Sequence, residues 1–320
     1  MKSQLHSENP TSSRTISDGN RSGTVLLFGE VLADNFPDRS VLGGAPFNVA
    51  RHLKAFKQTP VLITRLGDDA LRDEIMGLMK QNGMEASAVQ IDKTYPTGQV
   101  KVHIEGVGHR FEILPRQAYD FIDRDAVSAA VFSTHPSLVY FGTLAQRHET
   151  SRQSLEVLLN GTSGTKFLDI NLRAPWYDQN ILRQSLQYAD IVKVNDEELG
   201  LLGKMFGLSG VEPQSQIMQL MNQFEINRAV ITCGKYGAWQ INSQGEKVEA
   251  AVKNSKTKLM DTVGAGDGFS AVFMLGILLH WPVDKTLDRA NDFAAAICKI
   301  RGAIPERADF YKPFIREWGL

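Results

Sequence analysis

A loop of very small residues ends at a carboxylate in the segment DTVGAGD, which runs from Asp261 to Asp267. An apolar run that predicts a helix follows, so Gly264, Ala265 and Gly266 stand at a helix start. The first backbone N–H groups of a helix lack partners and carry partial positive charge, so this loop could bind a phosphate. Asp267 would then be a base beside that phosphate. A plain helix cap by Asp267 is the alternative that the segment alone leaves open.

Polar side chains and glycines also stand where other predicted strands end or helices begin. In open α/β sheets, ligands bind beyond the carboxyl ends of the strands. Six such places along this sequence therefore predict one cleft. They contain Asp34, Gly43, Gly44, Asn48, Asn171, Arg173, Asn195, Glu198, Gly234, Gly237 and Asp267.

The elements that must position these residues are strands and helices in alternation. The pattern predicts a first buried strand over Thr24–Leu32 and a helix over Ala70–Asn82. Between Thr97 and Leu114 the residues nearly alternate in polarity and glycines stand at a turn, which predicts a hairpin. Elsewhere the alternation predicts an α/β fold with a mainly parallel sheet that helices cover on both faces.

We expect one domain over residues 24–320, with a small β lid formed by parts of about 31–42 and 97–115. Residues 1–23 are rich in Ser, Thr and Asn and contain no apolar run, which predicts a disordered leader. Exposed lid strands would offer an edge for pairing, so a homodimer through the lid is a further expectation.

The composition excludes several classes of protein. The chain of 320 residues carries 35 basic and 36 acidic side chains, which gives no sign of a nucleic-acid-binding surface. No apolar run is long enough to span a membrane. Cys233 and Cys298 are too few for a disulfide framework, and we expect buried free thiols in a cytoplasmic protein.

Two common nucleotide-binding motifs are absent. The sequence contains no G-x-x-x-x-G-K-[ST], which excludes a P-loop enzyme. It also contains no G-x-G-x-x-G between a strand and a helix, which leaves a Rossmann dehydrogenase unsupported.

The motifs that are present resemble those of the ribokinase-like carbohydrate kinases, the PfkB family. DTVGAGD resembles the family's C-terminal signature, GGAPFNVA at Gly43–Ala50 its N-terminal one, and VNDEE its N-x-x-E. The match keeps the family's order from about Thr24 to Pro305. It implies a three-layer αβα fold and an ATP-dependent sugar kinase that uses Mg²⁺.

The resemblance also implies roles for the residues at the helix start. Asp267 would take the proton from the sugar hydroxyl, and the N–H groups of Gly264, Ala265 and Gly266 would form the anion hole for the transferred phosphoryl group. A Cβ in this loop would hold the phosphate away.

Two further pairs of roles concern metal ions and the nucleotide. Asn195 and Glu198 would organise Mg²⁺ through its waters, although, without the resemblance, acids that favour the dipole at a helix start explain them better. The Asp261 region would border a K⁺ ion. Residues expected beside ATP are Thr232, Gly234 and Gly237, for which a tight hairpin is the alternative, and Asn291, for which it is an ordinary polar group on the helix surface.

The substrate side carries the remaining expectations. Asp34 and Asn48 fall where the family holds sugar hydroxyls, next to Gly43 and Gly44, although each could be a simple turn or helix-start residue. The segment DINLRAPWY resembles the D-x-N-x-R of fructokinases and 2-keto-3-deoxygluconate kinases. Asn171 and Arg173 would then lie near the sugar or the γ-phosphate, unless Arg173 is a surface arginine.

The wording of these motifs is closest to bacterial fructokinases, so phosphorylation of fructose to fructose 6-phosphate is the first expectation. A 2-keto-3-deoxygluconate, ribose or nucleoside kinase stays open within the same family. A catalytically silent sugar-binding regulator is the alternative from another class, since a fold does not fix a function.

Overall fold

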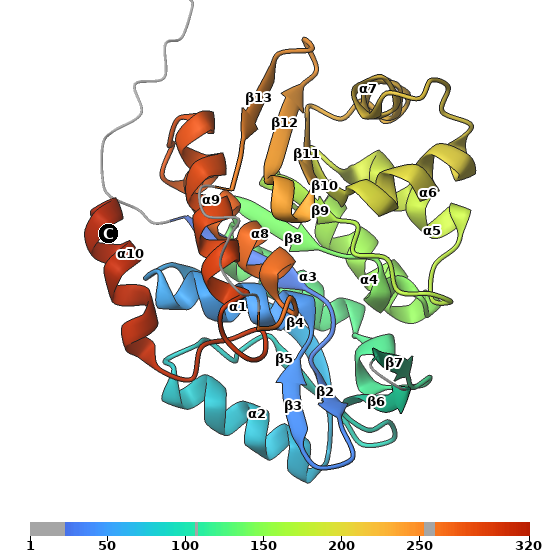
Figure 1. The fold of residues 1–320 in the computed structure, drawn as a ribbon. Coiled ribbons are helices and arrows are strands. Elements are labelled where there is room, and N and C mark those ends of the chain that lie inside the picture. The colour runs from blue at the N-terminus through green and yellow to red at the C-terminus, as the bar shows by residue number, and fades with distance from the viewer. Residues whose placement is uncertain (1–22, 106–107, 253–259) are drawn as a thin grey trace, which may run out of the picture.

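A large sheet between two layers of helices and a second, smaller sheet make up the computed structural model (Figure 1). The structure describes residues 23–105, 108–252 and 260–320. The expected leader, apart from Gly23, lies outside these residues.

The large sheet has nine strands, and all neighbouring pairs are parallel except those that involve its last two strands in sequence. The mainly parallel sheet predicted from the sequence is confirmed. Across the sheet the order is β13 (Lys247–Ala250), β12 (Ala238–Asn242), β11 (Arg228–Thr232), β10 (Ile191–Asn195), β9 (Thr165–Asp169), β8 (Leu138–Phe141), β1 (Thr24–Phe28), β4 (Thr59–Gly67) and β5 (Val89–Asp92).

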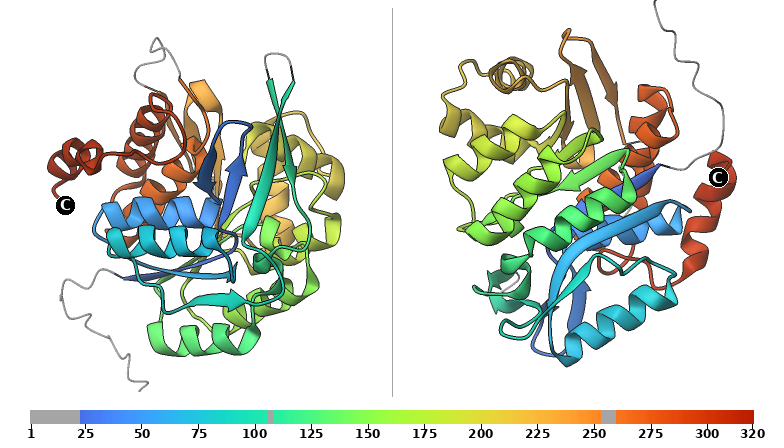
Figure 2. Two further views of the ribbon diagram at one scale, coloured as in Figure 1. Left: turned by 90° about the horizontal axis from the view of Figure 1, so that it is seen from below. Right: turned by 180° about the vertical axis from the view of Figure 1, so that it is seen from behind.

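Ten α-helices of the described residues form the two outer layers (Figure 2). One layer contains α1 (Ala45–Ala55), α2 (Ala70–Gln81), α8 (Ala265–Leu278), α9 (Val283–Ile297) and α10 (Lys312–Trp318). The other contains α3 (Arg124–Thr134), α4 (Glu149–Asn160), α5 (Gln179–Tyr188), α6 (Asp196–Phe206) and α7 (Pro213–Phe224). Short 3₁₀ turns are η1 (Ala118–Phe121), η2 (Leu144–Gln146), η3 (Gly234–Tyr236) and η4 (Ala308–Tyr311).

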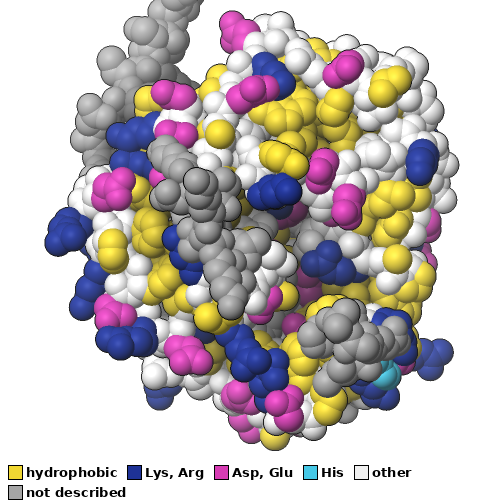
Figure 3. Space-filling model, viewed as in Figure 1, with side chains coloured by type: hydrophobic (Ala, Val, Ile, Leu, Met, Phe, Trp, Pro, Cys, Tyr) yellow, Lys and Arg dark blue, Asp and Glu magenta, His cyan; other side chains and the backbone are white. Residues whose placement is uncertain are grey.

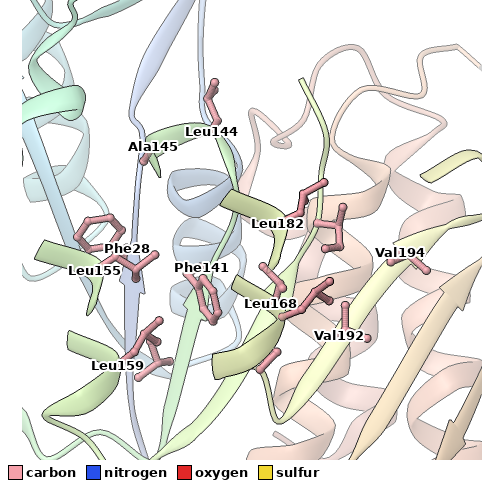
Figure 4. Packing of buried hydrophobic residues seen from close by; sticks show 14 of the residues in the cluster. Phe28, Phe141, Leu144, Ala145, Leu155, Leu159, Leu168, Leu182, Val192 and Val194 are labelled. Atoms are coloured by element: carbon pink, nitrogen blue, oxygen red, sulfur yellow. The ribbon is translucent and has the colours of Figure 1, made fainter. Parts of the chain in front are cut away.

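The central strands are apolar on both faces because each face meets a helix layer. Along β1, Val25 and Leu27 belong to the core under α1 and α8, whereas Leu26 and Phe28 belong to the opposite core. Figure 4 shows Phe28 in that second core, with residues of β8, β9, α4 and α5. A charged residue inside such a strand is therefore conspicuous.

The small sheet stands off the large one and has the order β3 (Ser40–Gly43), β2 (Leu32–Asn35), β6 (Gly98–Glu105) and β7 (Gly108–Ile113). Strands β6 and β7 form the hairpin predicted over Thr97–Leu114, and residues 106–107 at its turn lie outside the described residues.

The predicted strand over Thr24–Leu32 is wrong at its end. Strand β1 stops at Phe28, and Leu32 already begins β2 of the small sheet. The break is at Gly29, whose φ of 146° suits glycine and redirects the chain. Because the residues on both sides of Gly29 are largely apolar, a prediction based on hydrophobic periodicity does not detect this turn.

The structure also differs from the sequence predictions in the end of one helix, in several elements that were not predicted, and in the burial of the two cysteines. Helix α2 ends at Gln81, and Asn82 is its C-cap. The sequence reading missed α3, α7, α10, β5 and β13. Cys233 and Cys298 are free but half-buried rather than buried. Among the described residues, no helix is long and apolar enough to cross a lipid bilayer.

Candidate active site

Helix α8 begins at the small-residue loop, with Gly264 as its N-cap in the left-handed conformation. Gly264 makes no side-chain cap, and Asp267 does not cap the helix either: its Oδ2 accepts a hydrogen bond from Asn48 Nδ2 of α1 at 2.8 Å. The expectation of a plain helix cap at Asp267 is therefore wrong. The N–H groups of the first turn and this carboxylate lie at the same end of α8, and one of these groups, the Ala265 N–H, already donates to the Thr262 carbonyl oxygen at 3.3 Å.

Asn48 is almost completely buried, at 4% exposure, and its Oδ1 has no hydrogen-bond partner among the described residues. A buried amide oxygen without a partner costs free energy, so this atom suits a donor that arrives with a ligand. Asn48 and Asp267 thus form one polar pair between α1 and α8, which pack together.

The pKa of Asp267 is raised above its ordinary value, chiefly because its surroundings remove water from the carboxylate. The hydrogen bond from Asn48 opposes this rise, the nearby charge of Asp169 adds to it, and Lys193 and Arg173 oppose it. A carboxylate that is harder to ionise is a better proton acceptor once ionised.

Arg173 is exposed and lies within electrostatic reach of three carboxylates, those of Glu30, Asp34 and Asp267. Its Nη1 donates to the Leu172 carbonyl oxygen at 3.0 Å. Loss of solvent raises the pKa of Asp34 to about 6, and Arg173 partly opposes that rise. The structure thus places Arg173 within electrostatic reach of both Asp34 and Asp267.

Glu30, which the sequence reading missed, lies in the turn between β1 and β2 with 5% exposure. Burial raises the pKa of Glu30 to about 7, although its carboxylate accepts backbone hydrogen bonds from its own residue and from Ala45. Ala45 is the first residue of α1, whose N-cap Gly44 has no side chain. A Cβ on Gly44 would stand 2.5 Å from the Glu30 carbonyl oxygen, so Gly44 is required by this contact.

Asn195 and Glu198 form a capping box at the start of α6. Asn195 Oδ1 accepts from the Glu198 N–H at 2.8 Å, and Glu198 Oε2 accepts from the Asn195 N–H at 2.9 Å. Glu198 Oε1 accepts from the Leu172 N–H at 2.8 Å, which ties α6 to the segment after β9. Burial raises the pKa of Glu198, and the charge of Asp169 adds to that rise.

The residues predicted beside the nucleotide lie at the end of β11, in the connection from β11 to β12, and on α9. A Cβ on Gly237 would stand 2.2 Å from the Ala250 carbonyl oxygen, and the same oxygen accepts from Asn291 Nδ2 at 2.8 Å. Asn291 is thus buried between α9 and β13, and the expectation of an ordinary surface group is wrong. Thr232 pairs with Asn195 across β11 and β10, and Gly234 opens the exposed 3₁₀ turn that follows.

Asp261 joins the small-residue loop to the segment after α9. Its Oδ1 accepts from the Val263 N–H and its Oδ2 from the Gly302 N–H, both at 3.0 Å. On the other side of the site, Asn171 follows β9 with a φ of 41°, so the backbone turns sharply there. The face of the molecule that carries these segments is hollowed, and acidic and basic side chains lie around the hollow (Figure 3).

No group of three or more His, Cys, Asp or Glu side chains in the described part of the chain could hold a metal ion.

A cavity of about 590 Å³ lies elsewhere, between β5, α3 and α4, beside the stacked rings of Tyr95 and Phe121. None of the predicted site residues lines it.

The comparison with known proteins decides the family. The model of the pfkB family carbohydrate kinases matches residues 24–308. The chain belongs to this family.

Relatives and solved structures agree with the pfkB assignment. The fructokinase of Escherichia coli is 27% identical over 269 residues, which are 80% of this chain and 85% of that protein. A fructokinase structure from Xylella fastidiosa with bound ATP has a TM-score of 0.80 at 19% identity and covers 93% of this chain and 99% of its own. A fructokinase double mutant from Vibrio cholerae, bound to fructose, ADP and a potassium ion, has a TM-score of 0.76 at 21% identity and covers 91% and 98%.

Three of the buried charged residues that the motifs left without a role lie within electrostatic reach of Asp267: Glu30, Asp169 and Lys193. The signal that could have found them is a charged side chain inside an otherwise apolar strand or strand end, as in FGEVL, KFLD and IVKVN. Their positions beside Asp267 follow from the fold alone.

Our first prediction concerns Gly264 and Gly302, which share a φ of 78°. A Cβ on Gly264 would stand 2.3 Å from the Ala303 Cβ, whereas nothing lies within 4 Å of a Cβ on Gly302. We expect Gly302→Ala to lower the free energy of unfolding by about 1–2 kcal/mol and Gly264→Ala by about 2–5 kcal/mol. Urea unfolding measures both. Equal losses of unfolding free energy in the two variants would show that the contact with Ala303 is not the reason why position 264 requires glycine.

Our second prediction concerns the buried Glu30 carboxyl. Its pKa in the folded chain is about 7 against an ordinary 4.5, so the folded chain favours the protonated form. Wild-type stability due to this group is fully present below pH 4.5 and is lost as the pH rises through 7. The stability of Glu30→Gln relative to wild type should therefore increase over this window, by roughly 3 kcal/mol. A difference that stays constant in urea unfolding between pH 4.5 and pH 8 would contradict this account.

Proposed function

We propose that this pfkB-family kinase transfers the γ-phosphoryl group of ATP to fructose and forms fructose 6-phosphate. The observation that carries the proposal is the hydrogen bond between Asn48 and Asp267, which holds a carboxylate of raised pKa at the start of α8. Asp34 and Arg173 lie on the sugar side of that carboxylate in this proposal.

The proposed reaction is an in-line displacement. The sugar hydroxyl oxygen forms a bond to the γ-phosphorus while the bond to the bridging oxygen of ADP breaks. The hydroxyl proton passes to the carboxylate of Asp267. The N–H groups of Gly264, Ala265 and Gly266 stabilise the charge on the transferred phosphoryl group, because α8 begins there without a side-chain cap.

The nucleotide side of the proposal uses the segments around β10, β11 and α9. Thr232, Gly234, Gly237 and Asn291 border ATP, with the amide nitrogen of Asn291 already committed to Ala250. Asn195 and Glu198 hold waters of Mg²⁺, which neutralises phosphate charge when bound. Asp261 and the backbone near Gly302 border a K⁺ ion.

The sugar side uses the turn before β2, the start of α1 and the segment after β9. The buried Oδ1 of Asn48 accepts from one sugar hydroxyl, and Asp34 accepts from another. Gly43, Gly44, Asn171 and Arg173 complete the wall. The small sheet acts as a lid that excludes water from the reaction, and its edge strands β3 and β7 offer a dimer surface.

The alternatives within the family are a 2-keto-3-deoxygluconate, ribose or nucleoside kinase. Fructose is favoured by the relatives that carry the name fructokinase. A silent sugar-binding regulator is disfavoured because Asp267 and its small-residue loop are intact and in contact with Asn48.

The substrate prediction is tested by coupled ADP release with Mg-ATP and K⁺. We expect the highest kcat/KM with fructose among fructose, ribose, 2-keto-3-deoxygluconate, glucose, mannose and adenosine. In Asp34→Ala the KM for the sugar should rise at least about tenfold, with little change in the KM for ATP, because a buried hydroxyl loses its partner. A lead for another acceptor would replace fructose, and equal effects on both KM values would remove Asp34 from the sugar site.

The base is tested by Asp267→Asn, which keeps the shape of the side chain. We expect kcat to fall by a factor of about 10²–10⁴ while ATP binding and folding persist. Asp284→Asn is the matched control, since Asp284 is also a first-turn aspartate but lies exposed on α9. A kcat for Asp267→Asn close to that of the control would exclude Asp267 as the base.

A further inference from the structure

An ion pair lies beneath the start of α8. Lys193 on β10 and Asp169 on β9 are register partners in the large sheet, with 6% and 2% exposure. The Nζ of Lys193 donates to both carboxylate oxygens of Asp169 at 2.9 Å. A buried ion pair of this kind contributes little net stability, because removing two charges from water offsets their attraction.

Asp169 is held by more than the lysine. Ser270 Oγ on α8 donates to its Oδ2 at 2.8 Å, and the Tyr140 hydroxyl on β8 reaches the same oxygen at 3.3 Å. Groups from β8 and α8 thus hold the carboxylate, which in turn holds the ammonium. Two of the three N–H bonds of Lys193 are used in this way, and a third is left.

The ammonium held by Asp169 lies beside Gly266, the exposed second residue of α8. Lys193 Nζ is 3.6 Å from the point where a Cβ on Gly266 would stand, and beyond the glycine's own helix turn no other described atom lies within 4 Å of that point. Space is therefore open beside the first turn, with a fixed cation next to it. An anion in that space would meet both the backbone N–H groups at the start of α8 and Lys193.

We propose that Lys193 is a further phosphate-binding residue of this site, in contact with the transferred phosphoryl group, and that Asp169 is the positioning residue that holds it there. The inference rests on the proposed phosphoryl transfer at α8. Asp267 and Glu198 are the other acids that Lys193 influences, and neither forms an ion pair with it in the described residues.

The ion pair with Asp169 explains how the flexible side chain of Lys193 can serve as a phosphate-binding group. A free lysine loses rotamer freedom when it binds a ligand, whereas Lys193 is already immobile in the folded chain. Charge that is fixed before the reaction needs no reorganisation in the transition state.

The test compares two nucleotides in four variants of the full chain. The variants are Lys193→Met, Asp169→Asn, the double variant with both changes, and Lys166→Met as the control on the neighbouring strand β9. Isothermal titration gives the affinities for Mg-ADP and for the Mg complex of β,γ-imido-ATP without sugar. Thermal unfolding confirms that each variant is folded. The double variant removes both charges, so it stays informative if Lys193→Met leaves Asp169 unpaired and fails to fold.

We expect Lys193→Met and the double variant to bind the imido-ATP about 10–100-fold more weakly, with a change of less than about threefold for ADP. Lys166→Met should keep the wild-type ratio of the two affinities. Asp169→Asn should shift this ratio in the same direction as Lys193→Met but by a smaller factor, about 3–10-fold, because the lysine stays but loses the carboxylate that positions it. In turnover assays, both variants without the lysine should lose about 10²-fold in kcat.

An unchanged ratio of the two affinities in the folded double variant would overturn the proposal, because a merely structural pair does not distinguish the two nucleotides. An equal loss for both nucleotides would overturn it as well. The titrations need no sugar: a wild type that binds imido-ATP but phosphorylates no acceptor would refute the proposed function, while the affinity ratio would still decide the role of Lys193.

Discussion

The large sheet has helices on both of its faces, and this burial governs where charge can stand in the molecule. Charged groups inside such a sheet lose water and need partners, so most of the polar chemistry is confined to the edge where the parallel strands end. The start of α8 lies at that edge. Helix α8 packs against α1, and this packing brings Asn48 of α1 into hydrogen-bond contact with Asp267 of α8. The position of the candidate site is thus a consequence of the packing of α1 and α8 on the same face of the large sheet.

The exceptions to this rule are informative. Glu30, Asp169 and Lys193 are charged and almost fully buried, and each lies within electrostatic reach of Asp267 or of the carboxyls around it. Asp169 and Lys193 neutralise each other, whereas Glu30 is held by backbone groups at the start of α1. A fold that places three buried charges around one carboxylate keeps the electrostatic field there fixed, which suits a reaction that moves a charged group.

The glycines of the site serve packing as much as ligands. Gly264 and Gly237 are each pressed against other backbone or Cβ atoms, so a side chain would collide before any ligand arrived. A Cβ on Gly266 would instead have only Lys193 Nζ within 4 Å outside its own helix turn, and a Cβ on Gly234 or Gly302 would have no atom within that distance. Within the loop at the start of α8, Gly264 is therefore required by its contact with Ala303, and Gly266 is the glycine beside which space is open.

The sequence alone determined the class of the fold, the hairpin of the small sheet and the identity of most of the residues at the edge, because periodicity and turn-forming residues are local properties. It did not determine where β1 ends, since the turn at Gly29 lies between apolar residues. Nor could it show that Asp267 bonds to Asn48 rather than capping α8, or that Lys193 pairs with Asp169, because those partners are 219 and 24 residues apart. Contacts between distant segments depend on strand register and helix packing, and only the tertiary structure fixes these.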